Sequence, residues 1–395
     1  MKNSPPLTGI TVLAIEHAIA APLCTRQLAE LGARVIKVER RLGGDFARHY
    51  DSRAGGECSH FVWTNRSKES LTLDLKHEAA QEVIQRLLAR ADVLVQNLAP
   101  NAASRMGLDF DSLHEQFPGL IVCNISGYGE GGPYADKKAY DLLVQAEAGF
   151  LTVTGTPSEM AKSGISIADI AAGMQAHSAV LGALIQRSRT GEGSRIDISM
   201  LEAMVEWMGF PLYYAYDGQE APPRSGTDHA SIYPYGVFKT GDDQAILIGL
   251  QNEREWQAFC CNVLGDSHLQ GDPRFSSNEA RSVNRLALRT LVQARFERLN
   301  HDEVGRLLDS ARIAFATVND MKAVWQHPQL HALDRLASVE TEQGALSYLK
   351  PPAQNSDFEH KVTAVPALGQ HTDQILSEIG FNQTEIQVLR KKQVV

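Results

Sequence analysis

One ionisable residue, Asp169, lies within an apolar stretch, Ala-Asp-Ile-Ala-Ala-Gly at 168–173. Ile167 and Ile170 flank it closely. A carboxylate that is buried without a partner is costly, so some feature of the fold must hold it there. An Asp in the first turn of a helix accepts backbone N–H bonds and interacts favourably with the helix dipole. By pattern alone, helix capping is the simplest explanation of Asp169, although a carboxylate of this kind is also a possible nucleophile.

The glycine-rich segment 127–132, Gly-Tyr-Gly-Glu-Gly-Gly, follows a predicted strand and fits the GxGxxG spacing of dinucleotide-binding turns. A single match to this spacing is weak, and Pro-Tyr follows it. Glycine permits a positive φ and leaves room for a ligand close to the backbone. The segment therefore predicts either a ligand-binding loop or a tight turn that binds nothing.

Metal binding and the common nucleophile motifs find no support in the sequence. Thirteen histidines are present, but HExxH, HxH and CxxC are absent. His327 and His331 are four apart with Pro328 between them, and His360 and His371 flank a loop. No GxSxG elbow or P-loop occurs. We expect no metal site.

Alternating strand and helix patterns must position these segments. Short β-branched runs alternate with amphipathic stretches through the first two hundred residues, as in a mostly parallel sheet covered on both faces. Gly32 is placed to end the first helix. The pattern predicts an α/β fold with a Rossmann-like large domain, whose segments are ITVLAI (10–15), PLCTRQLAELG (22–32), RVIKVE (34–39), EAAQEVIQRLLARA (78–91), DVLVQN (92–97), LIVCNIS (120–126), a long helix over 168–186 and RIDISM (195–200).

A polar stretch rich in proline and glycine follows Tyr216 and predicts a domain boundary. Beyond it, 235–250 reads as a hairpin that turns at 240–243, and 252–325 is mostly helical in pattern. We expect a large domain over 1–216, a linker and small α+β domain over 217–330, and a return to the large domain over 331–395. Thr384 with Gln387 predicts a capping box for the last helix.

Composition excludes several classes of protein. The chain of 395 residues is 43% hydrophobic and 22% charged, and no apolar run approaches the roughly 20 residues that span a bilayer. The N-terminus reads as a first strand rather than a signal peptide. A net charge of −9 argues against nucleic acid as a partner. Five cysteines without CxxC spacing favour a reducing, cytoplasmic location: Cys24, Cys58, Cys123, Cys260 and Cys261.

A series of motifs in order resembles one known family over nearly the whole chain. The sequence is similar to the class III (family III) CoA-transferases, the formyl-CoA and carnitine CoA-transferase group, which are related to the α-methylacyl-CoA racemases. The motifs that carry the resemblance are LTGITVLAIEHAIAAP at the start, GARVIKVERRLGGDFAR (32–48), NRSKESLTLDLK (65–76), ADVLVQNLAP (91–100), GYGEGGPYADKKAYDLLVQAEAG (127–149), ADIAAGM (168–174) and TGEGSRIDISMLEA (190–203).

This resemblance implies a two-domain subunit in an interlocked homodimer. It also implies that Asp169 is the nucleophile, because an enzyme carboxylate can become a mixed anhydride and then an aspartyl-CoA thioester. A helix N-terminus would keep Asp169 ionised for attack. No cofactor is implied beyond the coenzyme A thioester substrates.

Coenzyme A needs cations for its phosphates and packing for its adenine. The lysines and arginines that the resemblance assigns to these roles could equally be solvated surface charges. By resemblance, His17 and Ala18 lie near the thioester, Arg40 near the adenosine, Leu73 and Lys76 along the nucleotide, Asn97 and Leu98 by the pantetheine, and Arg105 and Lys138 at phosphates.

Tyr140 distinguishes the two relatives. The racemase branch has a His at this position, before an Asp, which gives an acid/base pair for removing a proton next to the thioester. A tyrosine with its ordinary pKa near 10 is a poor proton acceptor at neutral pH. Transferase is therefore favoured over a racemase-type isomerase. A third alternative is a non-catalytic acyl-CoA-binding protein, which would tolerate loss of Asp169.

Departures from the oxalate-handling relatives bear on the substrate. Ile19 stands where they have Gln, and Ala21 and Asn101 stand where they have Gly. The segments 60–76 and 311–320 most resemble the branch that acts on C4 to C5 dicarboxylates. We expect transfer of CoA from succinyl-CoA to itaconate, mesaconate, citramalate or malate, or intramolecular C1–C4 transfer in mesaconyl-CoA. By residue type, Arg48, His49 and Arg66 are candidates for the second carboxylate, with structural salt bridges as the alternative.

Overall fold

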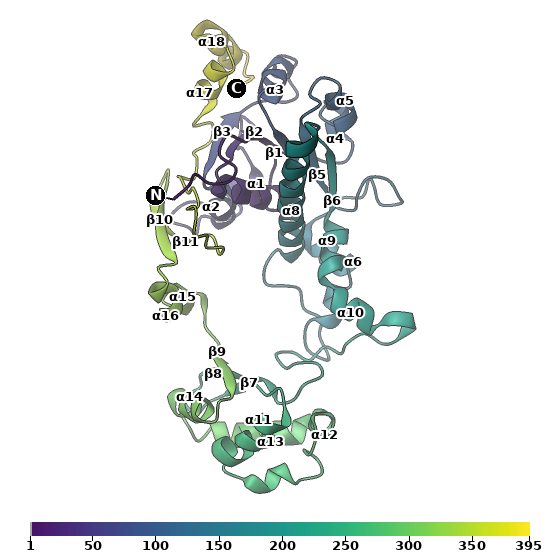
Figure 1. Cartoon of the computed structure of the whole chain (residues 1–395), viewed down its shortest axis with the longest axis vertical. Coiled ribbons are helices and arrows are strands. Elements are labelled where there is room, and N and C mark those ends of the chain that lie inside the picture. The colour runs from purple at the N-terminus through teal and green to yellow at the C-terminus, as the bar shows by residue number, and fades with distance from the viewer. Residues whose placement is uncertain (1) are drawn as a thin grey trace. The chain divides into compact units, whose positions relative to one another are not determined.

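The computed structural model describes residues 2–395, which form two compact units (Figure 1). The first unit comprises the described residues up to Phe150 together with Ser163–Leu212 and Ala332–Val395. The second comprises Leu151–Lys162 and Tyr213–His331. Its main part begins and ends within a few residues of the predicted 217–330, and it also includes Leu151–Lys162, which the sequence analysis assigned to the large domain.

A six-stranded parallel sheet forms the centre of the first unit, with strand order β3-β2-β1-β4-β5-β6. The predicted α/β class with a Rossmann-like large unit is confirmed. The strand order reverses between β1 and β4, which is the point where open α/β sheets bind ligands beyond the carboxyl ends of their strands. The strands are β1 (Thr11–Ile15), β2 (Arg34–Glu39), β3 (Lys68–Thr72), β4 (Val93–Gln96), β5 (Ile121–Ser126) and β6 (Arg195–Ser199).

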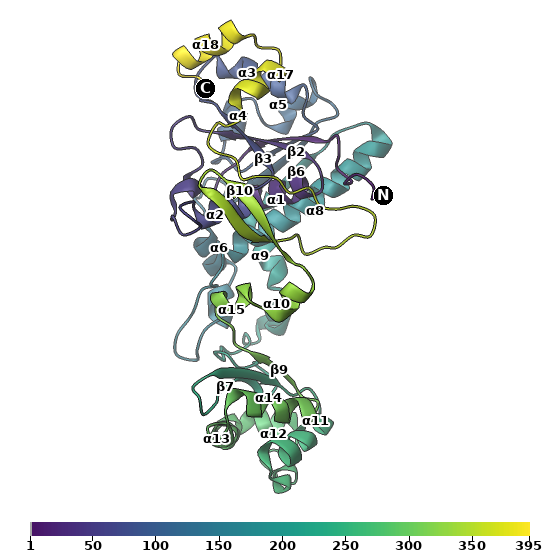
Figure 2. The same cartoon turned by 90° about the vertical axis from the view of Figure 1, so that its left-hand side faces the viewer.

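Helices cover both faces of this sheet (Figure 2). Alternate strand residues such as Leu13 and Ile36 join a core with α3, α5, α17 and α18, as the two-residue period of a strand requires. The opposite face carries α1 and α8. The helices of this unit are α1 (Ala20–Glu30), α2 (Ser59–Asn65), α3 (Ala80–Leu88), α4 (Ala102–Arg105), α5 (Phe110–His114), α6 (Asp141–Glu147), α8 (Ile167–Thr190), α9 (Met200–Trp207), α17 (Thr372–Glu378) and α18 (Gln383–Lys391), with a short 3-10 helix η1 at Phe46–His49.

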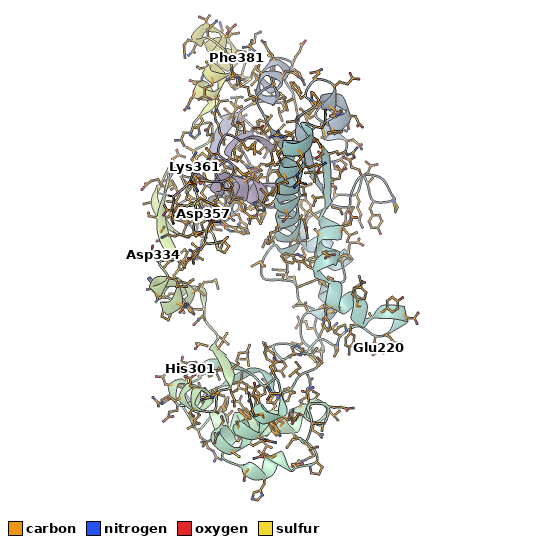
Figure 3. All side chains as sticks on the ribbon, in the orientation of Figure 1. Glu220, His301, Asp334, Asp357, Lys361 and Phe381 are labelled. Atoms are coloured by element: carbon orange, nitrogen blue, oxygen red, sulfur yellow. The ribbon has the colours of Figure 1, made fainter. Side chains whose placement is uncertain are left out.

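The returning C-terminal part is tied to the rest of the first unit. The Lys361 N–H donates to the Glu30 carbonyl oxygen at 2.9 Å, and the Phe381 ring lies 4.0 Å from the Arg86 guanidinium (Figure 3). A hairpin of β10 (Leu336–Thr341) and β11 (Gly344–Leu349) belongs to this part, and its Val339 packs on Phe61.

The second unit contains the predicted hairpin, formed by β7 (Tyr235–Lys239) and β8 (Ala245–Gly249), with β9 (Ala314–Thr317) as a third antiparallel strand. Its own core includes Phe238, Trp256 and Phe296. The helices of this unit and of the segments that join the two units are α7 (Phe150–Val153), α10 (Gly209–Tyr214), α11 (Glu253–Ala258), α12 (Asn278–Val283), α13 (Arg285–Phe296), α14 (His301–Ser310), α15 (Met321–Trp325) and α16 (Pro328–Ala332), with short 3-10 helices η2 (Tyr216–Gly218) and η4 (Ser267–Gln270) and a π-helix η3 (Phe259–Leu264).

Two helix assignments need comment. The last helix is capped two residues earlier than predicted, because Asn382 and Glu385 form the capping box in place of Thr384 and Gln387. Helix α8 is long and apolar enough to cross a membrane by length and composition alone. The core helix of a globular unit meets the same test, and α8 packs against α1 and α9.

Candidate active site

The predicted thioester residues lie at the strand-order reversal. His17 follows β1 and Asn97 follows β4, and the two residues exchange hydrogen bonds across the gap between these strands. The His17 N–H donates to Asn97 Oδ1 at 3.0 Å, and Asn97 Nδ2 donates to the His17 carbonyl oxygen at 2.9 Å. The Asn97 side chain therefore fixes the backbone at the end of β1, where a ligand would approach.

Ala18 adopts a left-handed conformation, with φ of 62°. Residues with a Cβ atom disfavour this region, so the surroundings must hold it. The Ala18 N–H donates to Asp45 Oδ1 at 3.1 Å. Helix α1 begins two residues later at Ala20, so the bend at Ala18 sets where the first turn of α1 starts.

Asp169 lies near this bend because α8 runs alongside α1. A Cβ on Gly173 would come within 2.6 Å of the Ala20 carbonyl oxygen, so glycine is what allows the two helices to approach so closely. One turn further along α8, His177 is within electrostatic reach of Arg26 and Glu30 of α1. The helices therefore run in the same direction, and Asp169, one turn before Gly173, lies level with the residues that precede Ala20.

Asp169 does not cap its helix. The Asp141 carboxylate, at the start of α6, accepts the Ala168 N–H at 2.8 Å and the Asp169 N–H at 3.4 Å. Gln145 Nε2 donates to the same carboxylate at 2.6 Å. The first-turn donors of α8 thus bond to Asp141 rather than to the Asp169 side chain.

The charge state of Asp169 differs from the expectation that the helix N-terminus keeps it ionised. Burial, followed by the negative charge of Asp141, raises the pKa of the Asp169 carboxyl to about 7. No cation offsets these two effects among the residues that the structure describes. Asp169 is therefore a weakly solvated carboxylate that binds a proton more tightly than an ordinary Asp does.

Aromatic rings connect the end of β1 with the surroundings of Asp169. The rings of His17 and Phe46 are 4.6 Å apart, those of Phe46 and Tyr50 are 6.3 Å apart, and those of Tyr50 and His60 are 5.5 Å apart. Burial and the charges of Asp45 and Asp169 raise the pKa of Tyr50. Phe46 and Tyr50 are exposed, so this strip offers an open aromatic wall beside the carboxylate. No pattern in the sequence points to these rings.

Tyr140, at the N-cap of α6, leaves 70% of its surface exposed. Tyr140 and Asp169 are both close enough to Tyr50 to contribute to its raised pKa. Tyr140 therefore belongs to the same site. The residue that the sequence analysis missed beside it is Asp141, whose position after Tyr140 at the start of an amphipathic helix was the available signal.

Three cations predicted to bind CoA are free of ion pairs. Across residues 2–395, no carboxylate pairs with Lys76, Arg105 or Lys138, and all three side chains are exposed. Asn101, just before α4, donates to Asp136 at 2.8 Å, which ties the Arg105 segment to the Lys138 loop. A small, shallow and mainly apolar pocket lies between the Lys76 and Arg105 segments, lined by Leu75, Ala80, Gln81, Ile84, Met106 and Leu108. The exposed cations beside it suit phosphate groups.

The remaining predicted CoA contacts follow other strands of the sheet. Arg40, after β2, is exposed, and its guanidinium lies 5.3 Å from the Phe46 ring. Leu73, after β3, is buried, so only its backbone can face a ligand. Leu98 follows Asn97 after β4 and is half-buried. The structure thus brings these residues to one edge of the sheet.

The residues suggested for a second substrate carboxylate have other partners. Arg48 makes paired hydrogen bonds with Glu39 at 2.8 Å and lies 3.7 Å from the Phe61 ring. Arg66 pairs with Glu30 at 2.6 Å. His49 Nε2 lies 2.9 Å from the Gly43 carbonyl oxygen. The alternative of structural salt bridges therefore describes both arginines.

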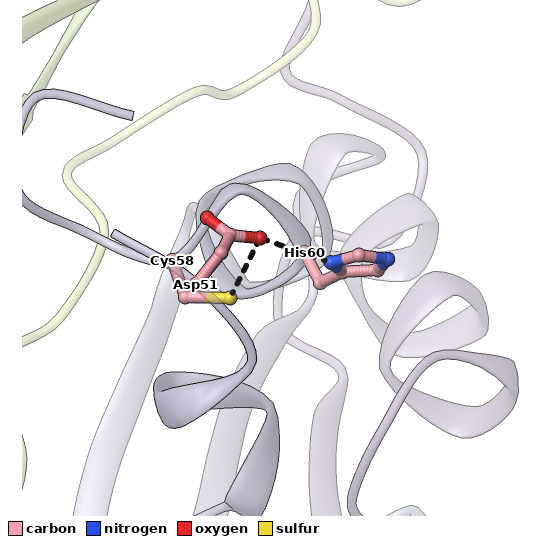
Figure 4. Close-up of side chains that lie close together, drawn as sticks. All are labelled: Asp51, Cys58 and His60. Carbon is pink, nitrogen blue, oxygen red and sulfur yellow. Dashed lines mark hydrogen bonds and ion pairs between the residues drawn. The ribbon is translucent and has the colours of Figure 1, made fainter. Parts of the chain in front are cut away.

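One cluster has metal-type ligands, although the sequence predicted no metal site. Asp51, Cys58 and His60 bring three ligand atoms within 4.8 Å of one another (Figure 4). Asp51 accepts hydrogen bonds from the N–H groups of Arg53 and Ser59 and from the Ser59 hydroxyl, and these bonds hold the pKa of Asp51 well below its usual range. Hydrogen bonding at the start of α2 accounts for the arrangement without an ion.

Comparison with known proteins identifies the family. The model of CoA-transferase family III matches residues 7–372. An acyl-CoA transferase of Fusarium pseudograminearum is 36% identical, over 96% of this chain and 86% of that protein. The succinyl-CoA:glutarate CoA-transferase of Homo sapiens is 33% identical, over 96% and 87%. The crystal structure of a CAIB/BAIF family protein from Brucella suis matches with a TM-score of 0.87 and 32% identity, over 95% of this chain and 100% of that one.

The parallel sheet offers a ligand-binding edge where its strand order reverses, and a carboxylate lies beside that edge. These features fit an enzyme that transfers a group from a nucleotide-bearing substrate. The chain belongs to CoA-transferase family III and is a CoA-transferase. The narrower expectation of a mesaconate or itaconate branch stays a prediction.

Proposed function

We propose that this enzyme moves CoA from succinyl-CoA to a small dicarboxylate and that Asp169 carries the CoA between the two. The observation on which this rests is the setting of Asp169. It is a partly buried carboxylate without a cation, next to the end of β1. A carboxylate in such a setting is poorly solvated, and poor solvation favours its attack on a carbonyl carbon.

The proposed cycle begins with ionised Asp169. A carboxylate oxygen attacks the thioester carbonyl carbon of the donor, the C–S bond breaks, and the CoA thiolate leaves a mixed anhydride behind. The thiolate then attacks the Asp169 carbonyl carbon, and the donor acid departs as a carboxylate. The aspartyl-CoA thioester that remains reacts with the acceptor carboxylate by the same two steps in reverse order, so no proton is consumed.

Backbone donors at the start of α1 fit the negative oxygen that develops in each step. The N–H groups at the start of α1 have no intrahelical partner, and a helix N-terminus favours negative charge. Lys76, Arg105 and Lys138 would hold the phosphates of CoA at the pocket lined by Leu75 and Met106. The aromatic strip of Phe46 and Tyr50 would line the acyl chain.

The choice of a dicarboxylate acceptor draws on two similarities. The resemblance of segments 60–76 and 311–320 favours C4 to C5 dicarboxylates. The relative from Homo sapiens bears the name succinyl-CoA:glutarate CoA-transferase, and glutarate is also a C5 dicarboxylate. Glutarate therefore joins itaconate, mesaconate, citramalate and malate as a proposed acceptor, and intramolecular transfer in mesaconyl-CoA is a variant of the same chemistry.

A homodimer is the proposed assembly. Helices α8 and α9 of the first unit expose large apolar side chains, with Met174 at 45%, Ile185 at 57% and Trp207 at 43% exposure. Side chains of this kind are often covered by another subunit. Size in solution tests this proposal, since a monomer at low micromolar concentration would contradict it.

Intact mass after incubation with succinyl-CoA tests the proposed function. The native enzyme should gain the mass of CoA minus water, and Asp169→Asn should not. Separate addition of glutarate, itaconate, mesaconate, citramalate and malate should discharge the adduct for at least one acid. An adduct that none of them discharges would contradict the acceptor class, and the absence of any adduct would contradict the succinyl-CoA donor or the carrier.

A further inference from the structure

Four buried charged side chains lie directly behind the bend at Ala18. Glu16, Lys37, Asp45 and Lys68 are each at most 4% exposed, and their side chains carry two positive and two negative charges. Lys37 Nζ lies 2.8 Å from Asp45 Oδ2 and 3.4 Å from Glu16 Oε1. Lys68 Nζ lies 2.6 Å from Glu16 Oε1. The charges therefore compensate one another within the protein, as buried charges must.

Asp45 is the member of this group that reaches the bend. Its two carboxylate oxygens have separate partners. Oδ2 accepts from Lys37, and Oδ1 accepts from the Ala18 N–H at 3.1 Å and the Ala47 N–H at 2.9 Å. The Asp45 N–H in turn donates to Glu39 Oε1 at 3.0 Å. The backbone and the side chain of Asp45 are both held by hydrogen bonds, so its side chain is restricted to one rotamer.

The bend itself is a conformation that alanine disfavours. Ala18 has φ of 62° and lies between β1 and the first turn of α1. Relaxation of Ala18 to a negative φ would redirect Ile19 and Ala20, which begin the helix packed on Gly173 of α8. The hydrogen bond from Ala18 to Asp45 opposes this relaxation.

We propose that Asp45, held by Lys37, is a positioning residue for CoA transfer. It keeps Ala18 in the left-handed conformation and thereby holds the end of β1 and the start of α1 in register with Asp169. This proposal rests on the proposed function, because it concerns the same reaction. Asp45 makes no contact with the reacting atoms in this account, and its effect passes through the backbone of Ala18.

Glycine at position 18 separates this role from a general contribution to stability. Glycine adopts a positive φ without the penalty that alanine has. If Asp45 acts by holding this φ, Ala18→Gly should restore part of the activity that Asp45→Ala loses. If Asp45 only stabilises the fold, Ala18→Gly gives no such recovery, because glycine restores none of the charges or hydrogen bonds that were removed.

The experiment compares Asp45→Ala, Asp45→Asn, Ala18→Gly and the double variant Ala18→Gly/Asp45→Ala with the native enzyme. We measure the rate of CoA-adduct formation from succinyl-CoA in a single turnover, the affinity for free CoA and the melting temperature. Asp45→Ala should slow adduct formation by about tenfold to a hundredfold, with affinity for CoA within about twofold, since the proposed nucleotide contacts lie elsewhere. The double variant should be at least about threefold faster than Asp45→Ala.

Matched controls and a structural readout complete the test. Asp109 caps α5 through the Ser112 N–H and makes no hydrogen bond to Ala18 or Lys37, so Asp109→Ala removes a similar capping carboxylate and should leave adduct formation unchanged. Hydrogen exchange should show the Ala18 amide protected in the native enzyme and released in Asp45→Ala. Asp45→Asn retains an acceptor oxygen for Ala18, and it provides a folded comparison if Asp45→Ala does not fold.

Native rates in folded Asp45→Ala, or a double variant no faster than Asp45→Ala, would overturn the proposal. So would loss of activity in Asp45→Asn with no change in Ala18 exchange. Failure of the proposed function is seen separately, because the native enzyme itself would then form no CoA adduct.

Discussion

Two groups of carboxylates, one fully buried and one partly buried, lie near the end of β1, and they have opposite electrostatic surroundings. Burial alone would raise the pKa of Glu16 and of Asp45, but Lys68 and Lys37 lower the pKa of Glu16, and Lys37 lowers that of Asp45. Asp169 has no such cation, so burial and the charge of Asp141 raise its pKa to about 7. Similar side chains a short distance apart thus have different chemical roles.

The presence or absence of a lysine partner explains why one carboxylate can be structural and another can be a nucleophile. A carboxylate that is paired with a lysine is stabilised as an anion, and its lone pairs are occupied by donors. A carboxylate without donors keeps its lone pairs available and gains from forming a neutral ester-like bond. In this enzyme the paired group shapes the backbone, and the unpaired group is the proposed carrier.

Asp169→Asn should have the largest effect, because an amide cannot form the anhydride. Transfer should fall by about a thousandfold or more. Steady-state exchange between succinyl-CoA and the accepted acid measures this, with Asp109→Ala as the control. Substantial exchange by Asp169→Asn would remove the distinction between the two groups of carboxylates.

Lys37→Met should disturb the paired group most. It leaves Asp45 and Glu16 with one lysine for two buried carboxylates, and breaking a buried pair of this kind costs about 3–5 kcal/mol. Denaturant unfolding measures the loss. Lys239→Met, which removes an exposed pair with Asp243, should cost less than about 1 kcal/mol. Equal losses of unfolding free energy in the two variants would show that the buried ion pairs of Lys37 contribute no more to stability than an exposed pair does.

The rate of adduct formation should rise with pH through about 7, because Asp169 must be ionised to attack. The profile should follow one ionisation and level off above about pH 8. It is measured by single turnover with succinyl-CoA between pH 5 and 9. A flat profile over this range would show that Asp169 is already ionised at pH 5, as Glu16 and Asp45 are predicted to be.

Stability should change with pH in the opposite sense. The pKa of Asp169 is higher in the folded state than its ordinary value of 3.8, so the folded state binds the proton more tightly. This contribution is lost as the pH rises from about 4 through about 7. Asp169→Asn should therefore raise the melting temperature at pH 8 by a few degrees and raise it less at pH 5. A larger gain at pH 5 than at pH 8 would contradict the raised pKa.

Charge removal at the proposed phosphate contacts should have the smallest effects. Lys76→Ala and Arg105→Ala should each weaken the binding of free CoA by about threefold to tenfold, because an exposed cation contributes about 1 kcal/mol. The loss of affinity should be smaller at high salt, which screens exposed charges. Lys391→Ala, an exposed lysine of α18, serves as the control. Calorimetric titration measures the affinities, and equal affinity in all three variants would remove both residues from the site.

Much of the fold was predictable, because it depends on local patterns. The β-branched runs of β1, β2, β4, β5 and β6 and the long α8 gave the α/β class. Strand β3, Lys-Glu-Ser-Leu-Thr, was not singled out, since its polar residues pair inside the protein. The last helix is capped at Asn382, two residues before the predicted cap at Thr384. Asn382 and Thr384 each precede an acid or amide by three residues, and the sequence alone does not show which of the two is the cap.

The site was predictable only in its chemical types. Asp169 was identified from an isolated charge in an apolar run and from the family resemblance. Its raised pKa was not, because that depends first on burial and then on Asp141, which lies 28 residues away in sequence. The link from Lys37 through Asp45 to Ala18 joins three segments, and no periodicity reports such a contact. Sequence patterns therefore indicated the proposed carrier, and the structure showed what surrounds it.

Transfer of oxygen isotope tests the carrier role of Asp169 most directly. When an acceptor acid labelled with ¹⁸O in its carboxylates attacks the aspartyl-CoA thioester, the CoA thiolate leaves and the bridging oxygen of the new anhydride comes from the acceptor. The thiolate then attacks the acceptor carbonyl carbon, the acceptor C–O bond to the bridging oxygen breaks, and the labelled oxygen stays on Asp169. Peptide mass analysis after turnover should find ¹⁸O in the peptide that contains Asp169 and in no other. Exchange of CoA with no label on that peptide would contradict the account, because the acceptor would then have reacted without forming an anhydride with Asp169.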